Sequence, residues 1–457
     1  MRSALLLCVV LPACSNPPSA PAACPPAAAA PPAATSALLP SSSVPALPAS
    51  IAIAAPSASA PAHPLPPVAL FDEAPGPGFL PRAEPAEVGL DRGRLEEVIR
   101  EAESNGSDSL LVVKSGRLVA ERTFGTPRAP IETMSITKSV VSLAVGMLIG
   151  DGKIASLDAP LSTWYPEWKD GKRSRVTLRH VMTHTTGIEK RKGKQFRLYP
   201  DRLQRARSAP IADEPGKVFS YSNESTQLLA GIVKSACGKP IDVYLQERLF
   251  APLGITGWSW DKDKSGSVQT WYGLALTARD LAKLGMLMLA DGRWDGKPIV
   301  AASYVKQATS PAIESAPLYG LLWWLRFDGT VRVMGAEHRD ALRAAGFPSD
   351  KLLALLDKPI ASDEAWFLEA GALLDSAERA ALLDAKHKGL SLYGTRPGKQ
   401  TGYQADGWLG QKLGVYPEAK MVAVRQHRRR DGSEEENQKS GFATFHKMME
   451  AAVIPAR

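Results

Sequence analysis

The sequence predicts an α/β fold in which segments near both ends of the chain form one antiparallel sheet, flanked by helices and interrupted by an inserted, mainly helical region. Residues 109 to 124 indicate two strands around a turn at Ser115 and Gly116, and a second hairpin turns at Pro417 to Lys420. The chain between these hairpins is largely helical in its periodicity. Residues 330 to 395 are helical but carry no motif, and they form the predicted insertion, either a lid or subdomain or a surface elaboration.

Composition allows a large domain and argues against one class of partner. The 457 residues are 44% hydrophobic, which is ample for a core with more than one layer. The net charge of +8 is spread through sequence of mixed sign. The densest basic run, in "HRRRDGSEEENQK", is followed at once by acids and is typical of a solvated turn. We therefore expect no nucleic-acid partner.

The first residues resemble a bacterial export signal. "MRSALLLCVVLPACSN" has a basic Arg2, a short apolar stretch and then a small residue before Cys14. This predicts a lipoprotein-type secretory signal over residues 1 to 13, with Cys14 acylated as the mature N-terminus. The alternative is an ordinary signal cut further on, which would remove Cys14. We expect an exported protein, either a lipoprotein facing the periplasm or cell surface or a secreted one.

A proline-rich segment follows the signal. Residues 14 to 71 are rich in Pro, Ala and Ser and hold no Asp, Glu, Lys or Arg, which predicts a disordered tether. No later segment has the roughly 18 consecutive apolar residues of a membrane span, so a lipid would be the only membrane attachment. The main domain is then residues 72 to 457. Cys237 is its only cysteine, which excludes a disulfide within it.

One Ser-x-x-Lys motif stands at the start of a long apolar helix. In "IETMSITKSVVSLAVGMLIGDGKI" Ser135 precedes Lys138 by one helical turn, whereas the same motif at Ser259 and Ser303 has no such helix behind it. A serine in a first turn has unpaired backbone N–H groups and the positive end of the helix dipole around it. A lysine whose pKa is lowered by an apolar pocket can take the serine proton. The alternative is an ordinary helix start with a solvent-facing lysine.

A second motif strengthens the first. "EPGKVFSYSNESTQLLAGI" contains Tyr221 and Asn223 in the only Tyr-x-Asn of the chain. An ammonium nearby stabilises an ionised phenol, so Tyr221 can act as a base or proton relay, and the amide of Asn223 suits a substrate carbonyl. The alternative is a polar turn in which Asn223 caps a helix.

These motifs resemble those of the serine β-lactamase and penicillin-binding-protein superfamily, in the branch of class C β-lactamases, related esterases and 6-aminohexanoate-dimer hydrolases. Similar segments are "TLRHVMTHTTGI", "EPGKVFSYSN", "YLQERLFAPLGIT", "YGLLWWL" and "DGWLGQKLGVYPEAKMVAVRQ". They cover residues 85 to 430 apart from the insertion. The resemblance implies a β-lactamase/transpeptidase-like fold.

The resemblance also implies a mechanism. Ser135 would attack a carbonyl to form an acyl-enzyme, Lys138 and Tyr221 would share the proton transfers, and water would release the acyl group. The oxyanion hole would combine the Ser135 N–H with one from the strand around Ala405 to Trp408. The substrate and oxyanion residues so implied are Asn223, Asp406, Gly407 and Trp408. The partner is a small ester or amide, and no cofactor or metal is implied.

One departure from the family pattern bears on the substrate. β-Lactamases and transpeptidases usually carry Lys-Thr-Gly on the late strand, and this chain has only a near miss, "GKQTG", with Lys399 too far upstream. This favours an esterase or small-amide hydrolase over a β-lactamase or D-Ala peptidase. A non-catalytic module that binds cell-wall peptides is a further alternative. The basic loop at residues 189 to 212 indicates either anionic substrates or a solvated face.

Two other sites receive little support. No Gly-x-Ser-x-Gly occurs, which argues against an α/β-hydrolase nucleophile elbow. His180 and His184 are four apart on a predicted helix and could form a metal pair, but no glutamate lies between them to activate water.

Overall fold

The computed structural model describes residues 66–72, 79–125, 128–189, 193–314, 316–387, 389–430 and 441–455. The predicted signal, Cys14 and all but the last few residues of the predicted tether lie outside the described residues. Everything below concerns the compact unit Pro66–Arg457. Within its described residues, none of the helices has the length and apolar character needed to cross a bilayer.

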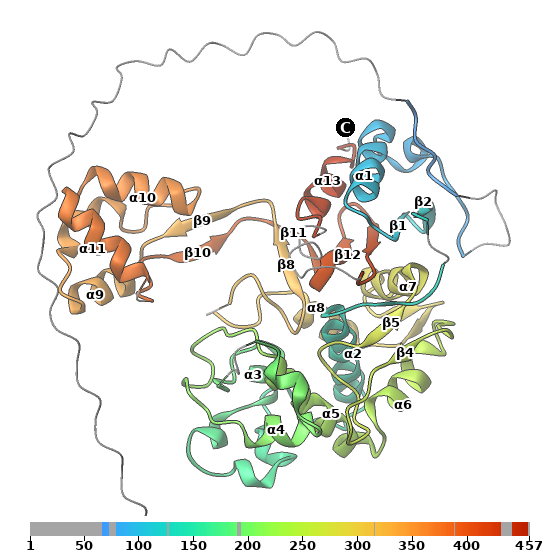
Figure 1. Ribbon diagram of the computed structural model, residues 1–457, viewed down its shortest axis with the longest axis horizontal. Coiled ribbons are helices and arrows are strands. Elements are labelled where there is room, and N and C mark those ends of the chain that lie inside the picture. The colour runs from blue at the N-terminus through green and yellow to red at the C-terminus, as the bar shows by residue number, and fades with distance from the viewer. Residues whose placement is uncertain are drawn as a thin grey trace, which may run out of the picture. The chain divides into compact units, whose positions relative to one another are not determined.

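Six strands form the main sheet, in the order β2-β1-β13-β12-β11-β8, with every neighbouring pair antiparallel. They are β1 (Ser109–Lys114), β2 (Arg117–Thr123), β8 (Trp324–Phe327), β11 (Gln400–Gly407), β12 (Gln411–Tyr416) and β13 (Met421–Gln426). Strands from the early and late parts of the chain meet at β1 and β13, which confirms the predicted α/β fold (Figure 1). The first predicted turn is also confirmed: Ser115 and Gly116 have φ values of 51° and 75°, as a two-residue hairpin requires.

Helices cover both faces of this sheet. Successive residues of β1 point to opposite sides, so Leu110 and Val112 pack into one core with helices α1 and α13, whereas Leu111 and Val113 pack into a larger one with α2 and α7. All four side chains are fully buried or nearly so, each worth about 1.5–3 kcal/mol of transfer free energy. The sheet is thus the middle layer of the domain.

The helices of this part are α1 (Arg92–Ser104), α2 (Ile136–Gly150), α3 (Leu178–Met182), α4 (Arg202–Ser208), α5 (Asn223–Cys237), α6 (Ile241–Leu245), α7 (Ala278–Leu289), α8 (Ala302–Ala308) and α13 (Phe445–Ala451). Helix α2 is buried on all sides from Ile136 to Leu148, as the mostly apolar run from Val140 to Leu148 indicates. Gly146 lets the ring of Tyr304 approach this helix so closely that an added Cβ would clash with it. The helix that begins beside Ser135 is therefore held rigidly in the core.

Short strands complete the body. β3 (Ile131–Glu132), β5 (Leu274–Leu276) and β4 (Ser259–Trp260) form a three-stranded sheet in that order, and β6 (Arg293–Trp294) pairs with β7 (Lys297–Pro298). The β3–β5 pair fixes the backbone that leads directly into Ser135.

Residues 330 to 397 form a lobe with its own core. A two-stranded ribbon of β9 (Thr330–Val333) and β10 (Gly394–Pro397) leads into α9 (Ala336–Ala344), α10 (Asp363–Ala372) and α11 (Ser376–His387) (Figure 1). Its apolar cluster, centred on Met334, Leu342 and Trp366, includes no described residue from outside the lobe. The ribbon was not predicted, because strands of four residues give too short an alternation to recognise.

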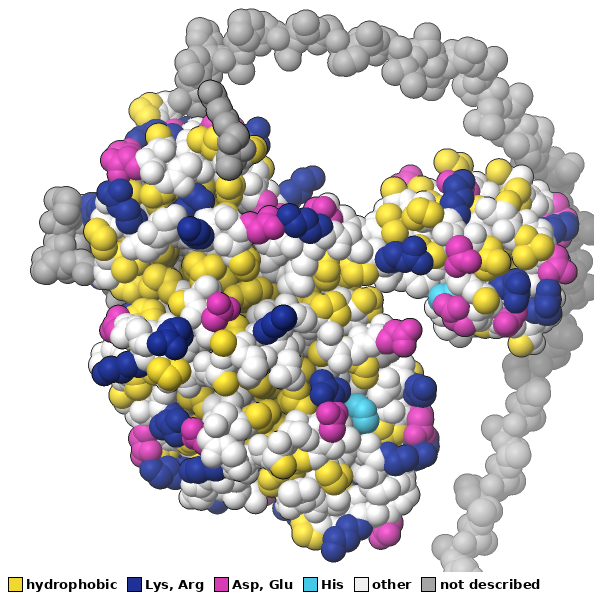
Figure 2. Space-filling view, turned by 180° about the vertical axis from the view of Figure 1, so that it is seen from behind, with side chains coloured by type: hydrophobic (Ala, Val, Ile, Leu, Met, Phe, Trp, Pro, Cys, Tyr) yellow, Lys and Arg dark blue, Asp and Glu magenta, His cyan; other side chains and the backbone are white. Residues whose placement is uncertain are grey.

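Charges of both signs are interspersed over the face of the molecule seen in Figure 2. Apolar side chains lie between them, without a broad region of basic side chains on that face.

Candidate active site

Ser135 stands where a strained turn enters helix α2. The Thr133 amide donates to the Leu274 carbonyl at 2.8 Å, which continues the pairing of β3 with β5. Met134 then takes a φ of 50°, a left-handed conformation that is uncommon for a side chain of this kind. Ser135 is the residue at the helix start, yet its hydroxyl makes no capping bond to the helix. The hydroxyl is therefore available to the side chains that face it, unlike that of an ordinary capping serine.

Lys138 lies directly against that hydroxyl. Its Nζ is 3.0 Å from Ser135 Oγ and donates to the Trp271 carbonyl oxygen at 3.1 Å. The side chain is only 1% exposed, so the amine has little access to water. The alternative of a solvent-facing lysine does not describe this residue.

The surroundings of Lys138 favour the neutral amine. Burial lowers the pKa of Lys138 well below its usual value, and the positive charge of Arg197 lowers it further. The carboxylate of Glu224 acts in the opposite direction and does not compensate. A neutral amine within hydrogen-bonding distance of a serine hydroxyl can accept its proton.

Tyr221 completes the cluster from the segment before α5. Burial raises its pKa to about 12, although a hydrogen bond between the Tyr221 and Ser135 hydroxyls acts to lower it. Its ring lies 4.4 Å from that of His184 and stacks on Trp324 at 5.9 Å, and Lys138 Nζ is 4.7 Å from its centroid. This phenol stays protonated at neutral pH because burial and the nearby charge of Asp406 outweigh the hydrogen bond with Ser135. It is suited to relay a proton that Lys138 accepts.

Asn223 lies beside the cluster but does not cap its helix. Ser222 is the cap: its Oγ accepts from the Ser225 amide at 3.1 Å, and Asn223 is the first helical residue. Asn223 Oδ1 is buried and has no hydrogen-bond partner among the described residues. The structure therefore leaves a buried acceptor in the motif that contains Tyr221.

His184 has a structural place in this arrangement. Its Nδ1 accepts from the Ser222 amide at 3.2 Å, and its ring packs against those of Tyr221 and Tyr319. Helix α3 ends at Met182, so His180 and His184 do not share a helical face as the sequence suggested. Nowhere in the described chain do three His, Cys, Asp or Glu residues gather as metal ligands would.

The end of β11 approaches Ser135 through its backbone. An added Cβ on Gly407 would come within 2.5 Å of the Thr133 oxygen and 2.9 Å of Met134 Cβ, so only glycine allows this approach. β11 ends at Gly407, and Trp408 opens a 3₁₀ turn rather than continuing the strand. The backbone around Gly407 and Trp408 thus lies next to the residues that precede Ser135.

The Asp406 carboxylate bonds to residues outside the cluster, although its charge also acts on Tyr221 and raises the pKa of that phenol. Asp406 Oδ1 is 3.1 Å from His446 Nε2, and its Oδ2 accepts from Lys412 Nζ at 3.0 Å and from Gln404 Nε2 at 2.9 Å. Burial alone would raise its pKa, but His446 and Lys412 outweigh that effect and lower it to about 2. Of the residues predicted from the sequence, the structure brings Ser135, Lys138 and Tyr221 together and turns the Asp406 carboxylate toward α13.

Comparison with known proteins identifies the family. The chain matches the model of the family described as Beta-lactamase over residues 94–443, which is more than half of its length. The chain belongs to this family. It is 32% identical over 162 residues to Esterase EstB of Burkholderia gladioli, a match that covers 30% of this chain and 41% of the esterase. The chain thus matches about two fifths of the length of that relative.

Solved structures agree in fold. A Bacillus anthracis protein provisionally assigned as a 6-aminohexanoate-dimer hydrolase is 20% identical, with a TM-score of 0.53 and 82% of this chain and 85% of that chain covered. A penicillin-binding protein from Bacillus halodurans is 16% identical, with a TM-score of 0.50 and coverage of 78% and 98%. These likenesses confirm a fold of the β-lactamase and penicillin-binding-protein superfamily.

Within this family the chain departs from Lys-Thr-Gly at the late strand. Strand β11 contains no lysine or arginine, and its Ala405 is buried in the core that contains α2. Lys399, the near miss in the sequence, lies before β11 begins and pairs with Glu418 at 2.7 Å on an exposed surface. The cation expected of a carboxylate-binding strand is absent from the described residues of β11.

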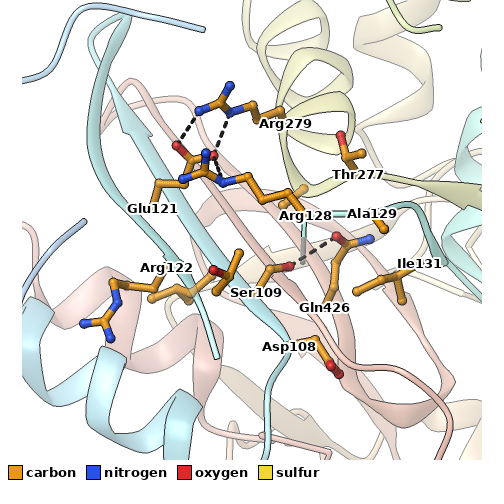
Figure 3. A pocket seen from close by; sticks show the side chains of 13 residues that line it. Asp108, Ser109, Glu121, Arg122, Arg128, Ala129, Ile131, Thr277, Arg279 and Gln426 are labelled. Carbon is orange, nitrogen blue, oxygen red and sulfur yellow. Dashed lines mark hydrogen bonds and ion pairs between the residues drawn. The ribbon is translucent and has the colours of Figure 1, made fainter. Parts of the chain in front are cut away.

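A pocket of about 180 Å³ is lined by residues of β1, β2 and the start of α7 and by none of the cluster residues (Figure 3). Its buried Glu121 accepts two bonds from Arg279, at 2.6 and 2.8 Å, and lies 3.5 Å from Arg128. Ser109 donates to Gln426 at 3.2 Å across the same space. These polar groups satisfy one another, which is typical of a structural network.

Sequence reasoning missed the groups that surround the cluster. Trp271 contributes a backbone carbonyl, which leaves no signal in a side-chain pattern. Arg197 comes from a loop segment and acts on Lys138, and Trp324 comes from the edge strand β8 and stacks on Tyr221. Both are far in sequence from the residues they meet, so only the fold brings them together.

Proposed function

We propose that this protein is a serine hydrolase that cleaves an ester or a small amide through an acyl-enzyme on Ser135, with Lys138 and Tyr221 handling the proton. The observation that carries the proposal is the buried Lys138 Nζ, 3.0 Å from Ser135 Oγ. Membership of the Beta-lactamase family and similarity to an esterase support the same class of reaction.

In the first half-reaction, neutral Lys138 accepts the Ser135 proton as Oγ attacks the substrate carbonyl carbon. The oxyanion forms near the positive end of α2, where the Ser135 N–H and a backbone N–H at Gly407 or Trp408 would stabilise it. The proton then passes from Lys138, through the Tyr221 hydroxyl, to the departing alcohol or amine. The bond to that group breaks and leaves the acyl group on Ser135.

The second half-reaction regenerates the enzyme. Water gives a proton to the same Lys138 and Tyr221 pair and attacks the acyl carbonyl carbon. The acid leaves, and Ser135 recovers its proton. Asn223, whose Oδ1 is a buried acceptor, would hold a donor of the substrate or orient its own amide toward a substrate carbonyl.

An ester or small amide fits better than a β-lactam or a D-Ala peptide. Those substrates present a carboxylate that the lysine of Lys-Thr-Gly usually holds, and this chain has buried Ala405 on β11. The β-lactamase or D-Ala peptidase function is the second candidate, because the family includes such enzymes.

The test compares the full chain with its Ser135→Ala variant on p-nitrophenyl butyrate and, in parallel, on nitrocefin. Loss of one member of the nucleophile cluster is expected to reduce ester turnover by about 10³-fold or more. Ser303→Ala is the matched control, because Ser303 belongs to a second Ser-x-x-Lys on the exposed side of α8 and should leave turnover unchanged.

Each result has a distinct meaning. Ester turnover that depends on Ser135, with nitrocefin untouched, supports the proposal. Turnover of nitrocefin instead supports the second candidate. No Ser135-dependent turnover of either substrate would favour the non-catalytic binding module.

A further inference from the structure

Arg197 lies next to the proposed catalytic lysine. It belongs to the 3₁₀ helix η5 (Gly193–Leu198), and its guanidinium carbon is 4.5 Å from the ring centroid of Tyr272 and 5.3 Å from that of Trp271. The carbonyl of Trp271 accepts from Lys138 Nζ, so Trp271 contacts both the lysine amine and the Arg197 guanidinium. The charge of Arg197 accordingly acts on Lys138.

The described arginines of this loop have different neighbours, and only Arg197 among them acts on Lys138. Arg207 pairs with Glu167 at 2.7 Å, Arg202 donates to the Arg197 carbonyl oxygen, and Arg205 stacks on Tyr199 at 5.2 Å. The bond from Arg202 holds the Arg197 backbone in place. The loop is therefore not a uniform solvated face, as one sequence interpretation had it.

The guanidinium of Arg197 has no hydrogen bond or ion pair with the residues the structure describes. The side chain is half-buried, so aromatic contact replaces part of its hydration. Its electrostatic neighbour Glu132 is not within ion-pairing distance of it. A planar fork of five N–H donors thus lies against Trp271, whose carbonyl accepts from Lys138, and such a fork matches a carboxylate in two parallel bonds.

We propose that Arg197 binds a carboxylate of the substrate, so that the preferred substrate is an ester or small amide that carries a negative charge. The inference rests on the proposed function and names its substrate class. It places anion recognition on η5, beside Tyr272, rather than on β11, where Ala405 stands. The loop and the strand come from different parts of the chain, so the two modes of recognition are structurally distinct.

The experiment uses two matched pairs of esters with the full chain. Mono-p-nitrophenyl adipate is compared with p-nitrophenyl hexanoate for a charge on the acyl side, and 4-carboxyphenyl hexanoate with phenyl hexanoate for a charge on the alcohol side. Arg197→Gln should lower kcat/KM for the anionic member of at least one pair by about 10-fold or more, because a charge-assisted bidentate contact is lost. The neutral members make no such contact, and any change in Lys138 protonation caused by loss of the Arg197 charge acts on both members of a pair, so the ratio of anionic to neutral kcat/KM isolates the contact.

Two variants serve as controls. Arg197→Lys keeps the charge without the fork and should restore part of the preference for the anionic ester. Arg207→Gln removes one positive charge from the same loop, at the Glu167 pair, and should leave both preferences unchanged. Neutral-ester turnover by each variant shows that the fold is intact.

An unchanged ratio of anionic to neutral kcat/KM in Arg197→Gln, for both pairs, would overturn the inference while the Ser135-dependent hydrolysis stands. If no ester is turned over, the proposed function fails and a binding measurement decides this inference separately. Calorimetric titration of adipate into Ser135→Ala should then show binding that is about 10-fold weaker in Ser135→Ala/Arg197→Gln. Equal affinity, or no binding to either, would overturn it.

Discussion

The cluster around Ser135 and the core of the inserted lobe are both buried, but they are built from different kinds of group. Helix α2 carries Ser139 and Ser142 into the core, where their hydroxyls donate to the carbonyls of Leu322 and Leu321 at 2.6 and 2.7 Å. The lobe core is apolar, with Trp366 and Leu342 fully buried. Polar groups in a core must each have a partner, whereas apolar groups need only fill space.

This difference explains why the residues of the Ser135 cluster could be predicted from the sequence and those of the lobe core could not. The proposed reaction requires particular residue types at the Ser135 cluster, at a particular spacing along the chain. The lobe core needs only apolar side chains of the right total volume, and many sequences meet that requirement. The comparison implies that changes in the cluster should abolish turnover without unfolding the protein, and that changes in the lobe should do the opposite.

The largest expected effect tests the first half of that comparison. Lys138→Met keeps an apolar chain of similar length but removes the base, so kcat should fall by roughly 10³-fold while the fold remains. In the unaltered protein, kcat/KM should decline with falling pH as Lys138 becomes protonated, and because burial lowers its pKa that decline should lie well below pH 10.5. Rates of p-nitrophenyl butyrate hydrolysis by both proteins over a range of pH give the loss of kcat in the variant and the pH at which kcat/KM of the unaltered protein declines.

Lys306→Met is the matched control for this prediction. Lys306 is the lysine of the exposed Ser-x-x-Lys on α8 and should have no effect on kcat. Equal losses in the two variants, or a Lys138→Met protein that keeps its turnover, would mean that the cluster does not act as proposed.

The second prediction tests the lobe. Trp366→Ala deletes the largest side chain of its core, which is 0% exposed, and should destabilise the lobe by about 3–5 kcal/mol through the cavity it leaves. Because no described body residue shares that core, turnover of p-nitrophenyl butyrate should stay within about 2-fold. Hydrogen exchange should show faster exchange in α9 to α11 and no change in β1 and β13.

Leu368→Ala supplies the control for the lobe. Leu368 lies on the same helix but is 77% exposed, so its loss should cost less than about 0.5 kcal/mol. If Trp366→Ala lowered ester turnover as strongly as it lowered lobe stability, the lobe and the active site would be one unit and the comparison would fail.

Much of the fold, and the centre of the site, could be predicted from the sequence because the signals were local. Runs of strand-forming residues on either side of turn residues predicted both hairpins, and the order of motifs singled out Ser135, Lys138 and Tyr221. The sequence does not show which side chains a strand residue contacts, so the bonds of Asp406 to Lys412 and His446 could not be predicted from it. Arg197 was hidden among the other basic residues of its loop, because only the packing against Tyr272 distinguishes it.

The smallest effect concerns the Asp406 carboxylate, and it asks whether every polar network in the body matters as much as the cluster. Asp406→Asn removes a charge paired with Lys412 and hydrogen-bonded to His446, and should lower the free energy of unfolding at pH 7 by at most about 2 kcal/mol. The folded pKa of Asp406 is depressed to about 2, so its contribution is present above the unfolded pKa of 3.8 and is lost as pH falls through 2. Urea unfolding at pH 7 and near pH 2 should therefore show a difference between variant and parent that shrinks on acidification.

Asp350→Asn, at an exposed pair with Arg343, is the control and should lower the free energy of unfolding by less than about 0.5 kcal/mol at either pH. A loss of turnover in Asp406→Asn as large as that in Lys138→Met would place this carboxylate in the catalytic machinery and erase the distinction between the cluster and the rest of the body.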